Sequence, residues 1–183
     1  ALISFVPWEH ANEILPIVQA ADSRVSASSI EKRLKDALPA TVEAVEIARK
    51  NGVSIVEPFA HNAPYKLSET SQIFLLGPSR DKYLRTWLPN YDCFPAQPAR
   101  QAGLLKGLVK IAERAMKWVA ETWDKELLTD PGDDETTSEN NSSAVVAIKQ
   151  GTNRFLFCGD AGVEALVDAL TLGKTLGLPV DGF

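Results

Sequence analysis

The fold is decided near the end of the chain by two apolar runs, Ala144-Val145-Val146-Ala147-Ile148 and Arg154-Phe155-Leu156-Phe157-Cys158. Both runs are rich in β-branched or aromatic residues, and the polar segment that joins them contains Gly151. This pattern predicts a β-hairpin. Gly159-Asp160-Ala161-Gly162 follows, and we then expect a helix over about residues 163–176 that buries Leu166, Val167, Leu170 and Leu176.

Outward from this hairpin, the chain alternates helical patterns with short strands. We expect helices over residues 8–21, 30–38, 39–50 and from Ser79 through Leu88, and strands over residues 53–56 and 72–76. Ser28 or Ser29 is the expected cap of the second helix, and Pro39 suits the first turn of the third.

The later part of the chain adds two further segments before the hairpin. Leucines and other apolar residues at helical spacing predict a long helix over residues 98–128, and acidic residues predict a mobile loop over residues 129–141. The expected fold is therefore a single α/β domain over residues 1–183, a mixed sheet covered by helices with a long helical insertion.

Composition restricts the function. The chain has 183 residues, of which 45% are hydrophobic, and a formal net charge of −5. This charge does not support general binding to nucleic acid, which depends on clustered Lys and Arg. The chain has no apolar run of membrane-spanning length, and its two cysteines are too few for a disulfide framework, so we expect a cytoplasmic protein. With only two histidines, a His-rich metal site cannot be built from this chain alone.

Asp160 is the clearest candidate for a residue with a chemical role. It follows an apolar strand and lies between glycines, where a rigid strand end can present a carboxylate and glycine permits close approach of a ligand. Such a carboxylate can bind a metal ion or bridge two of them. The alternative is that Asp160 only caps the helix that follows.

The wider sequence resembles the metallo-β-lactamase superfamily, in the branch related to the hydrolase domain of DNA-uptake competence proteins. The resemblance rests on Asn140-Asn141-Ser142-Ser143 before one strand, on Gly159-Asp160 after the next, and on Leu76-Gly77-Pro78-Ser79 with Tyr83 after an earlier strand. It covers about a third of the chain. It implies an αββα sandwich, Asp160 as a metal ligand, and Asn140, Asn141, Ser142, Ser143, Gly159 and Gly162 near the site.

The superfamily's His-x-His-x-Asp-His segment and the branch's later His-His-Gly-Ser segment are absent from the sequence. The resemblance therefore implies the central part of a longer hydrolase domain, with the missing histidines on segments outside this chain or on a second polypeptide. The implied activity is hydrolysis of a phosphodiester or acyl bond in a small-molecule or phosphodiester substrate. The implied cofactor is zinc or manganese, with two ions in the complete protein, and a metal-bound water would be the nucleophile.

Other interpretations stay open. His61, in a loop, and His10, near the start of a helix, are further candidate metal ligands, although nothing in their spacing shows that they meet Asp160. One rival function is a non-catalytic binding or regulatory module on the same fold, which docks through the long helix 98–128 with its basic stripe of Lys106, Lys110, Arg114 and Lys117. Another is a metal-dependent phosphatase of a different family, which would need further acidic ligands.

Overall fold

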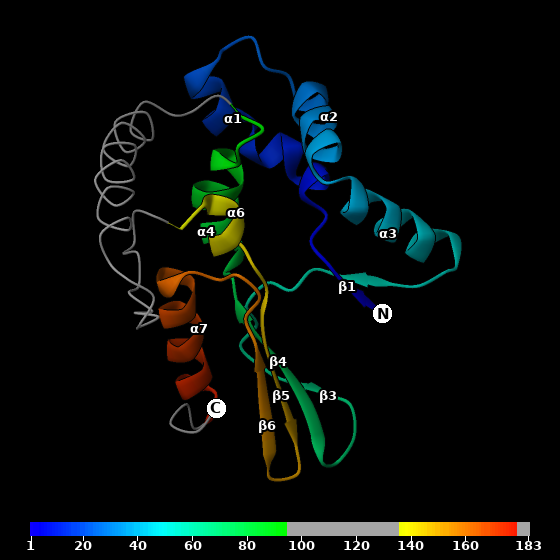
Figure 1. Cartoon of the computed structure of the whole chain (residues 1–183), viewed down its shortest axis with the longest axis vertical. Helices are drawn as coiled ribbons and strands as arrows, with labels where there is room; N and C mark the ends of the chain where they lie inside the picture. Colours follow the sequence, from blue (N-terminus) through cyan, green and yellow to red (C-terminus); the bar gives the residue numbers. More distant parts are fainter. Residues whose placement is uncertain (95–135, 179–183) are drawn as a thin grey trace, which may run out of the picture.

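The structure is a computed structural model that describes residues 1–94 and 136–178 (Figure 1). It has a mixed α/β architecture, as the sequence predicts. The predicted long helix over residues 98–128 and most of the predicted acidic loop lie outside the described residues. Within the described residues, no helix is both long and apolar enough to cross a membrane.

The first part of the chain is helical and follows the predicted boundaries closely. Its helices are the 3₁₀ helix η1 (Pro7–His10), α1 (Ala11–Ala21), α2 (Ala27–Ala37) and α3 (Pro39–Lys50). Pro39 opens α3 as expected, and Gly52, with φ of +67°, turns the chain out of it.

The predicted cap of α2 is wrong by a few residues. Ser26 is the N-cap, since its Oγ accepts a hydrogen bond from the Ser29 backbone N at 3.2 Å. Ser29 Oγ in turn accepts one from the Ser26 N at 3.0 Å. This reciprocal capping box makes Ser29 part of the first turn and so starts the helix earlier than the apolar pattern indicates.

The strands form two sheets rather than the single mixed sheet that was expected. A parallel pair is formed by β1 (Leu2–Ile3) and β2 (Ile55–Val56). A four-stranded antiparallel sheet has the order β3 (Tyr65–Lys66), β4 (Ser71–Gly77), β5 (Val145–Gln150) and β6 (Asn153–Phe157). The predicted hairpin is confirmed as β5–β6, and in the described residues parallel and antiparallel pairing do not mix within one sheet.

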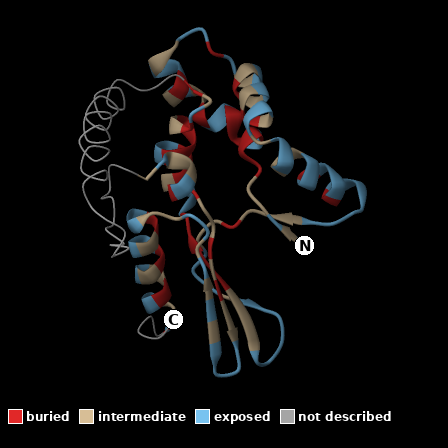
Figure 2. Ribbon diagram, viewed as in Figure 1, coloured by how far each residue is buried: buried red, intermediate tan, exposed pale blue. Residues whose placement is uncertain are grey.

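Two hydrophobic cores hold these elements (Figure 2). The first lies among the N-terminal helices and includes Ile14, Ile30, Leu34 and Val45. Tyr83, Leu84, Leu88 and Tyr91 enter it from the segment after β4, which contains α4 (Arg80–Lys82), the π-helical turn η2 (Tyr83–Trp87) and the 3₁₀ helix η3 (Leu88–Asn90). Ser79 caps α4 as predicted, accepting from the Lys82 N at 3.3 Å.

The second core lies between the antiparallel sheet and α7 (Val163–Thr175), which runs along one side of the strands in Figure 1. The residues of α7 that are fully buried are the small ones Ala165, Ala169 and Gly173, whereas Val167 is 55% exposed. The prediction that Val167 is buried is therefore wrong, and Leu166, Leu170 and Leu176 are only half-buried. Small residues face the sheet because α7 approaches it closely at Gly77, where a Cβ would lie 3.6 Å from the Ala169 Cβ.

The upper limit of the predicted acidic loop needs a correction. Residues Ser138–Asn141 form a short helix, α6, rather than the end of a mobile loop. Thr137 caps it by accepting a hydrogen bond from the Asn140 N at 3.2 Å, and Asn141 is only 6% exposed. A local cap and a buried amide side chain thus order this segment despite its polar composition.

Candidate functional site

Asp160 lies on a tight turn between β6 and α7. Gly159 has φ of +53°, and the Ala161 N donates a hydrogen bond to the Cys158 carbonyl at 3.0 Å, which closes the turn. The N-cap of α7 is Gly162 and not Asp160, so the interpretation of Asp160 as a helix cap is wrong. The Asp160 side chain is exposed, and it makes no hydrogen bond or ion pair with any other described residue.

The turn packs against the Asn-Ser segment, residues 140–143. A Cβ on Gly159 would lie 3.4 Å from the Ser143 Cβ, and one on Gly162 would lie 2.5 Å from the Asn141 Oδ1. Four of the expected neighbours of the site, Asn141, Ser143, Gly159 and Gly162, therefore meet. Asn140 is exposed, and Ser142 is buried and faces a different partner.

That partner is Tyr91, a residue that sequence reasoning did not single out. The Ser142 Oγ donates a hydrogen bond to the Glu139 carbonyl at 2.7 Å, and it lies 2.5 Å from the Tyr91 Oη. Because the serine hydroxyl has one proton, Tyr91 is the donor in the second contact. Burial raises the pKa of Tyr91, so the phenol keeps this proton. Tyr91 thereby fixes the segment that packs on the Asp160 turn.

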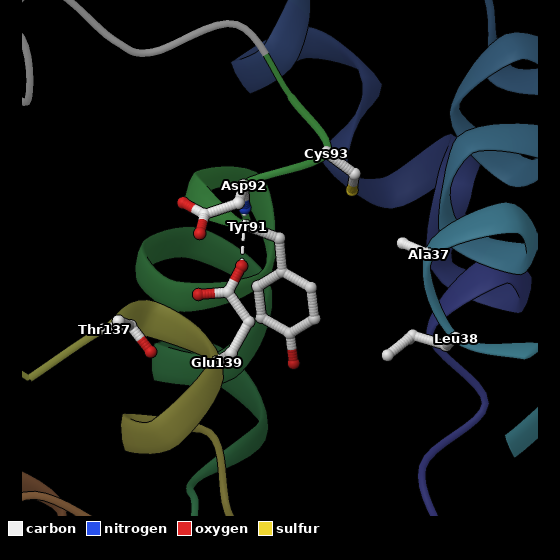
Figure 3. Close-up of a pocket in the computed structure, with 7 residues that line it drawn as sticks. All are labelled: Ala37, Leu38, Tyr91, Asp92, Cys93, Thr137 and Glu139. Atoms are coloured by element: carbon white, nitrogen blue, oxygen red, sulfur yellow. Dashed lines mark hydrogen bonds between the residues drawn. The ribbon is translucent and has the colours of Figure 1, made fainter. Parts of the chain in front are cut away.

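Tyr91 also lines a pocket of about 300 Å³ (Figure 3). Ala37, Leu38 and Cys93 line it together with Tyr91, Asp92, Thr137 and Glu139. The Glu139 Oε1 accepts a hydrogen bond from the Asp92 N at 2.5 Å, which ties α6 to the end of η3. Burial raises the pKa of the Cys93 thiol to about 11, so this cysteine is unsuited to act as a nucleophile or a thiolate ligand at neutral pH.

Neither of the two histidines contacts the Asp160 turn. His10 is 7% exposed, and its ring nitrogens contact Glu13 and Glu57 at 2.8 Å and 2.9 Å. Both nitrogens are therefore engaged with carboxylates, which leaves no lone pair for a metal and argues against His10 as a ligand. His61 is exposed beside β4, with its Nδ1 2.8 Å from the Ala63 carbonyl oxygen.

The described residues contain no group of three or more His, Cys, Asp or Glu side chains arranged to hold a metal ion. Asp160 alone does not make a metal centre, so the residues described here do not fit one without further ligands. The phosphatase alternative needs further acidic ligands, and no such group of three or more forms within residues 1–94 and 136–178. No family profile matches the chain, and no significant match is found among curated proteins or solved structures.

Proposed function

We propose that this chain contributes one side of the metal centre of a metallo-β-lactamase-like hydrolase, with Asp160 as the ligand that it supplies. The observation that carries the proposal is the Asp160 turn. Its backbone is closely constrained by Gly159 and Gly162, yet its carboxylate is exposed and serves neither as a cap nor in an ion pair with the described residues. The Asp160 carboxylate is thus held on a fixed turn and is free to contact a ligand.

The antiparallel sheet supports the sandwich architecture that this proposal requires. Phe74, Ala147 and Leu156 lie opposite one another on the side that packs on α7. The alternate residues make two apolar cross-strand rows, which are Tyr65–Ile73–Ile148–Phe155 and Leu75–Val146–Phe157. Phe155 and Phe157 remain 49% and 55% exposed. An apolar face of this kind is suited to pack on a second sheet, as in an αββα sandwich.

When bound, zinc or manganese, as two ions in the complete protein, would supply an activated water for hydrolysis of a phosphodiester or acyl bond. Asp160 would hold the metal from this chain's side, and the remaining ligands would come from polypeptide outside the described residues. The substrate would be a small molecule or a phosphodiester. The protein is also placed in the cytoplasm in this proposal, because two cysteines are too few for a disulfide framework.

The test begins with denaturing mass spectrometry of the protein purified from its source, which identifies every polypeptide that accompanies this chain. Metal content and hydrolysis of bis(p-nitrophenyl) phosphate are then measured on that intact preparation, with Asp160→Asn compared against wild type. Glu46→Gln, which changes an exposed carboxylate on α3, is the matched control.

We expect zinc or manganese in the wild type and the control. Asp160→Asn should weaken metal binding by at least the ~10–100-fold that loss of a supporting outer-shell partner costs. The melting temperature should stay the same in metal-free samples, because Asp160 does not cap α7. Equal metal content in Asp160→Asn and wild type would contradict the proposal. A preparation that binds no metal would favour the alternative of a non-catalytic binding module, whose expected docking helix 98–128 lies outside the described residues.

A further inference from the structure

His10 has an unusual environment, since a carboxylate contacts each of its ring nitrogens. Nδ1 lies 2.8 Å from the Glu13 Oε1, and Nε2 lies 2.9 Å and 3.0 Å from the two carboxylate oxygens of Glu57. The ring is buried and meets the edges of Phe59 and Tyr83, with centroid distances of 5.9 Å and 6.5 Å. Little water can therefore reach the ring itself.

These contacts fix the protonation state of the ring. Ionised carboxylates only accept hydrogen bonds, and a neutral imidazole has a single N–H to donate. Both contacts are satisfied together only when both nitrogens carry a proton, which is the imidazolium form. Burial lowers the pKa of His10, but the hydrogen bonds and charges of Glu57 and Glu13 outweigh it and leave the pKa raised. The pKa of Glu13 is lowered in return, by His10 and then by Arg80.

The same carboxylates also contact two other parts of the fold. Glu57, just after β2, also accepts a hydrogen bond from the Val6 N at 2.8 Å through its Oε1. Glu13, on α1, accepts hydrogen bonds from Arg80 of α4 at 2.7 Å. The protonated His10 ring is thus linked through these carboxylates to the segment after β1, to the segment after β2 and to the start of α1. Its loss would leave the negative charges of Glu57 and Glu13 facing a neutral ring.

We propose that His10 is a pH-sensitive clasp that, as an imidazolium, ties the β1–β2 segment to the start of α1 and releases it as pH rises. The charged and titratable groups that face it are Glu13 from α1, Glu57 from the segment after β2, and Tyr83 from η2, with Arg80 of α4 behind Glu13. Tyr83 stays neutral, because burial raises its pKa well above the ordinary value. His10 is therefore the group in this cluster whose charge is lost as pH rises through its raised pKa.

The raised pKa of His10 determines the direction in which the stability of the folded protein changes with pH. A histidine with a raised pKa in the folded protein stabilises it fully below pH ~6.5, the unfolded value, and this contribution is lost as pH rises through the folded pKa. Protection of the backbone amides of Leu2, Ser4 and Val6, which hydrogen-bond across the clasped segment, should fall in the same range.

The test is NMR titration of the histidine ring signals, together with amide hydrogen exchange in the same pH series. The chain has two histidines, so His61→Gln assigns both ring signals. We expect the titration midpoint of His10 to lie above 6.5. After correction for intrinsic exchange rates, the protection of the Val6 and Ser4 amides should fall by roughly tenfold for each pH unit by which that midpoint exceeds 6.5. Glu57→Gln should lower the midpoint, and Glu46→Gln should leave it unchanged.

Each part of the inference can fail separately. A His10 midpoint at or below 6.5 would overturn the imidazolium assignment with the wild-type protein alone. A raised midpoint with amide protection that stays constant across it would overturn the clasp. If Glu57→Gln does not fold, Glu13→Gln, at a more exposed contact, tests the same dependence of the midpoint on a facing carboxylate.

Discussion

Gly162 is the position where the candidate site can be perturbed most directly. Its backbone angles, φ of −74° and ψ of 175°, are open to any residue, so a substitution there causes no backbone strain. A Cβ would lie 2.5 Å from both the Asn141 Oδ1 and the Thr136 Cγ2, closer than side chains tolerate. Asn141 is buried, so its amide cannot move into solvent without disturbing α6.

We therefore expect Gly162→Ala to lower the free energy of unfolding by ~1–3 kcal/mol, the usual cost of overpacking a filled site. For a chain of this length the melting temperature should fall by roughly 2–12 °C. Urea and thermal unfolding followed by circular dichroism measure both quantities. Gly77→Ala is the control, because a Cβ there meets nothing closer than 3.6 Å and the backbone φ is not positive.

Gly162→Ser makes the test stricter. Serine is preferred to glycine at a helix N-cap, so at an open N-cap this substitution would be neutral or slightly stabilising. Here we expect it to destabilise the protein much as alanine does, because the Cβ contact with Asn141 outweighs any gain from the hydroxyl. A Gly162→Ala variant within ~0.5 kcal/mol of wild type would refute the close packing of the Asp160 turn on the Asn-Ser segment.

Three further predictions concern other contacts. Ser26→Ala should lower the free energy of unfolding by ~1 kcal/mol by breaking the capping box of α2, and Ser23→Ala, at an exposed serine in the preceding turn, should not. Tyr91→Phe should cost about 0.5–1.5 kcal/mol in urea unfolding by removing the hydrogen bond to Ser142, with the exposed Tyr65→Phe as its control. In a Cys158→Ser background at pH 8, a pKa of about 11 leaves about one in a thousand Cys93 thiols ionised. Alkylation of the native protein should therefore be on the order of 100-fold slower than in urea, and equal rates would contradict the burial of Cys93.

Several elements that depend on local signals were predicted well from the sequence, although the cap of α2 was not. The β5–β6 hairpin, the start of α3 at Pro39 and the cap at Ser79 each depend on residues within a few positions of one another. The buried face of α7 was not predicted correctly, because it depends on how near the helix lies to the sheet. The helix lies close to the strand at Gly77, so Ala165 and Ala169 are buried where larger residues were expected.

The candidate site likewise has a part that local sequence predicts and a part that it does not. Gly159, Asp160 and Gly162 are adjacent in sequence, and their turn could be predicted from the pattern of strand, glycine and helix. The Tyr91–Ser142 and His10–Glu57 contacts join residues 51 and 47 positions apart, so no local pattern could reveal them. Sequence reasoning did not single out Tyr91 and offered His10 only as a candidate metal ligand near the start of a helix, and long-range packing gives both their roles.

A carboxylate that contributes to the stability of a fold usually has a visible partner. Asp36 pairs with Lys32, Asp168 pairs with Lys82 and Asp22 pairs with Arg24. Asp160 has no such partner in the described residues, although the turn around it is held by a positive φ at Gly159 and by a filled contact at Gly162. If Asp160 were simply an exposed turn residue, Asp160→Asn would change neither stability nor ligand binding. Stability that is kept while metal binding is lost is the result that only the ligand role predicts, so the two measurements on this one variant decide between them.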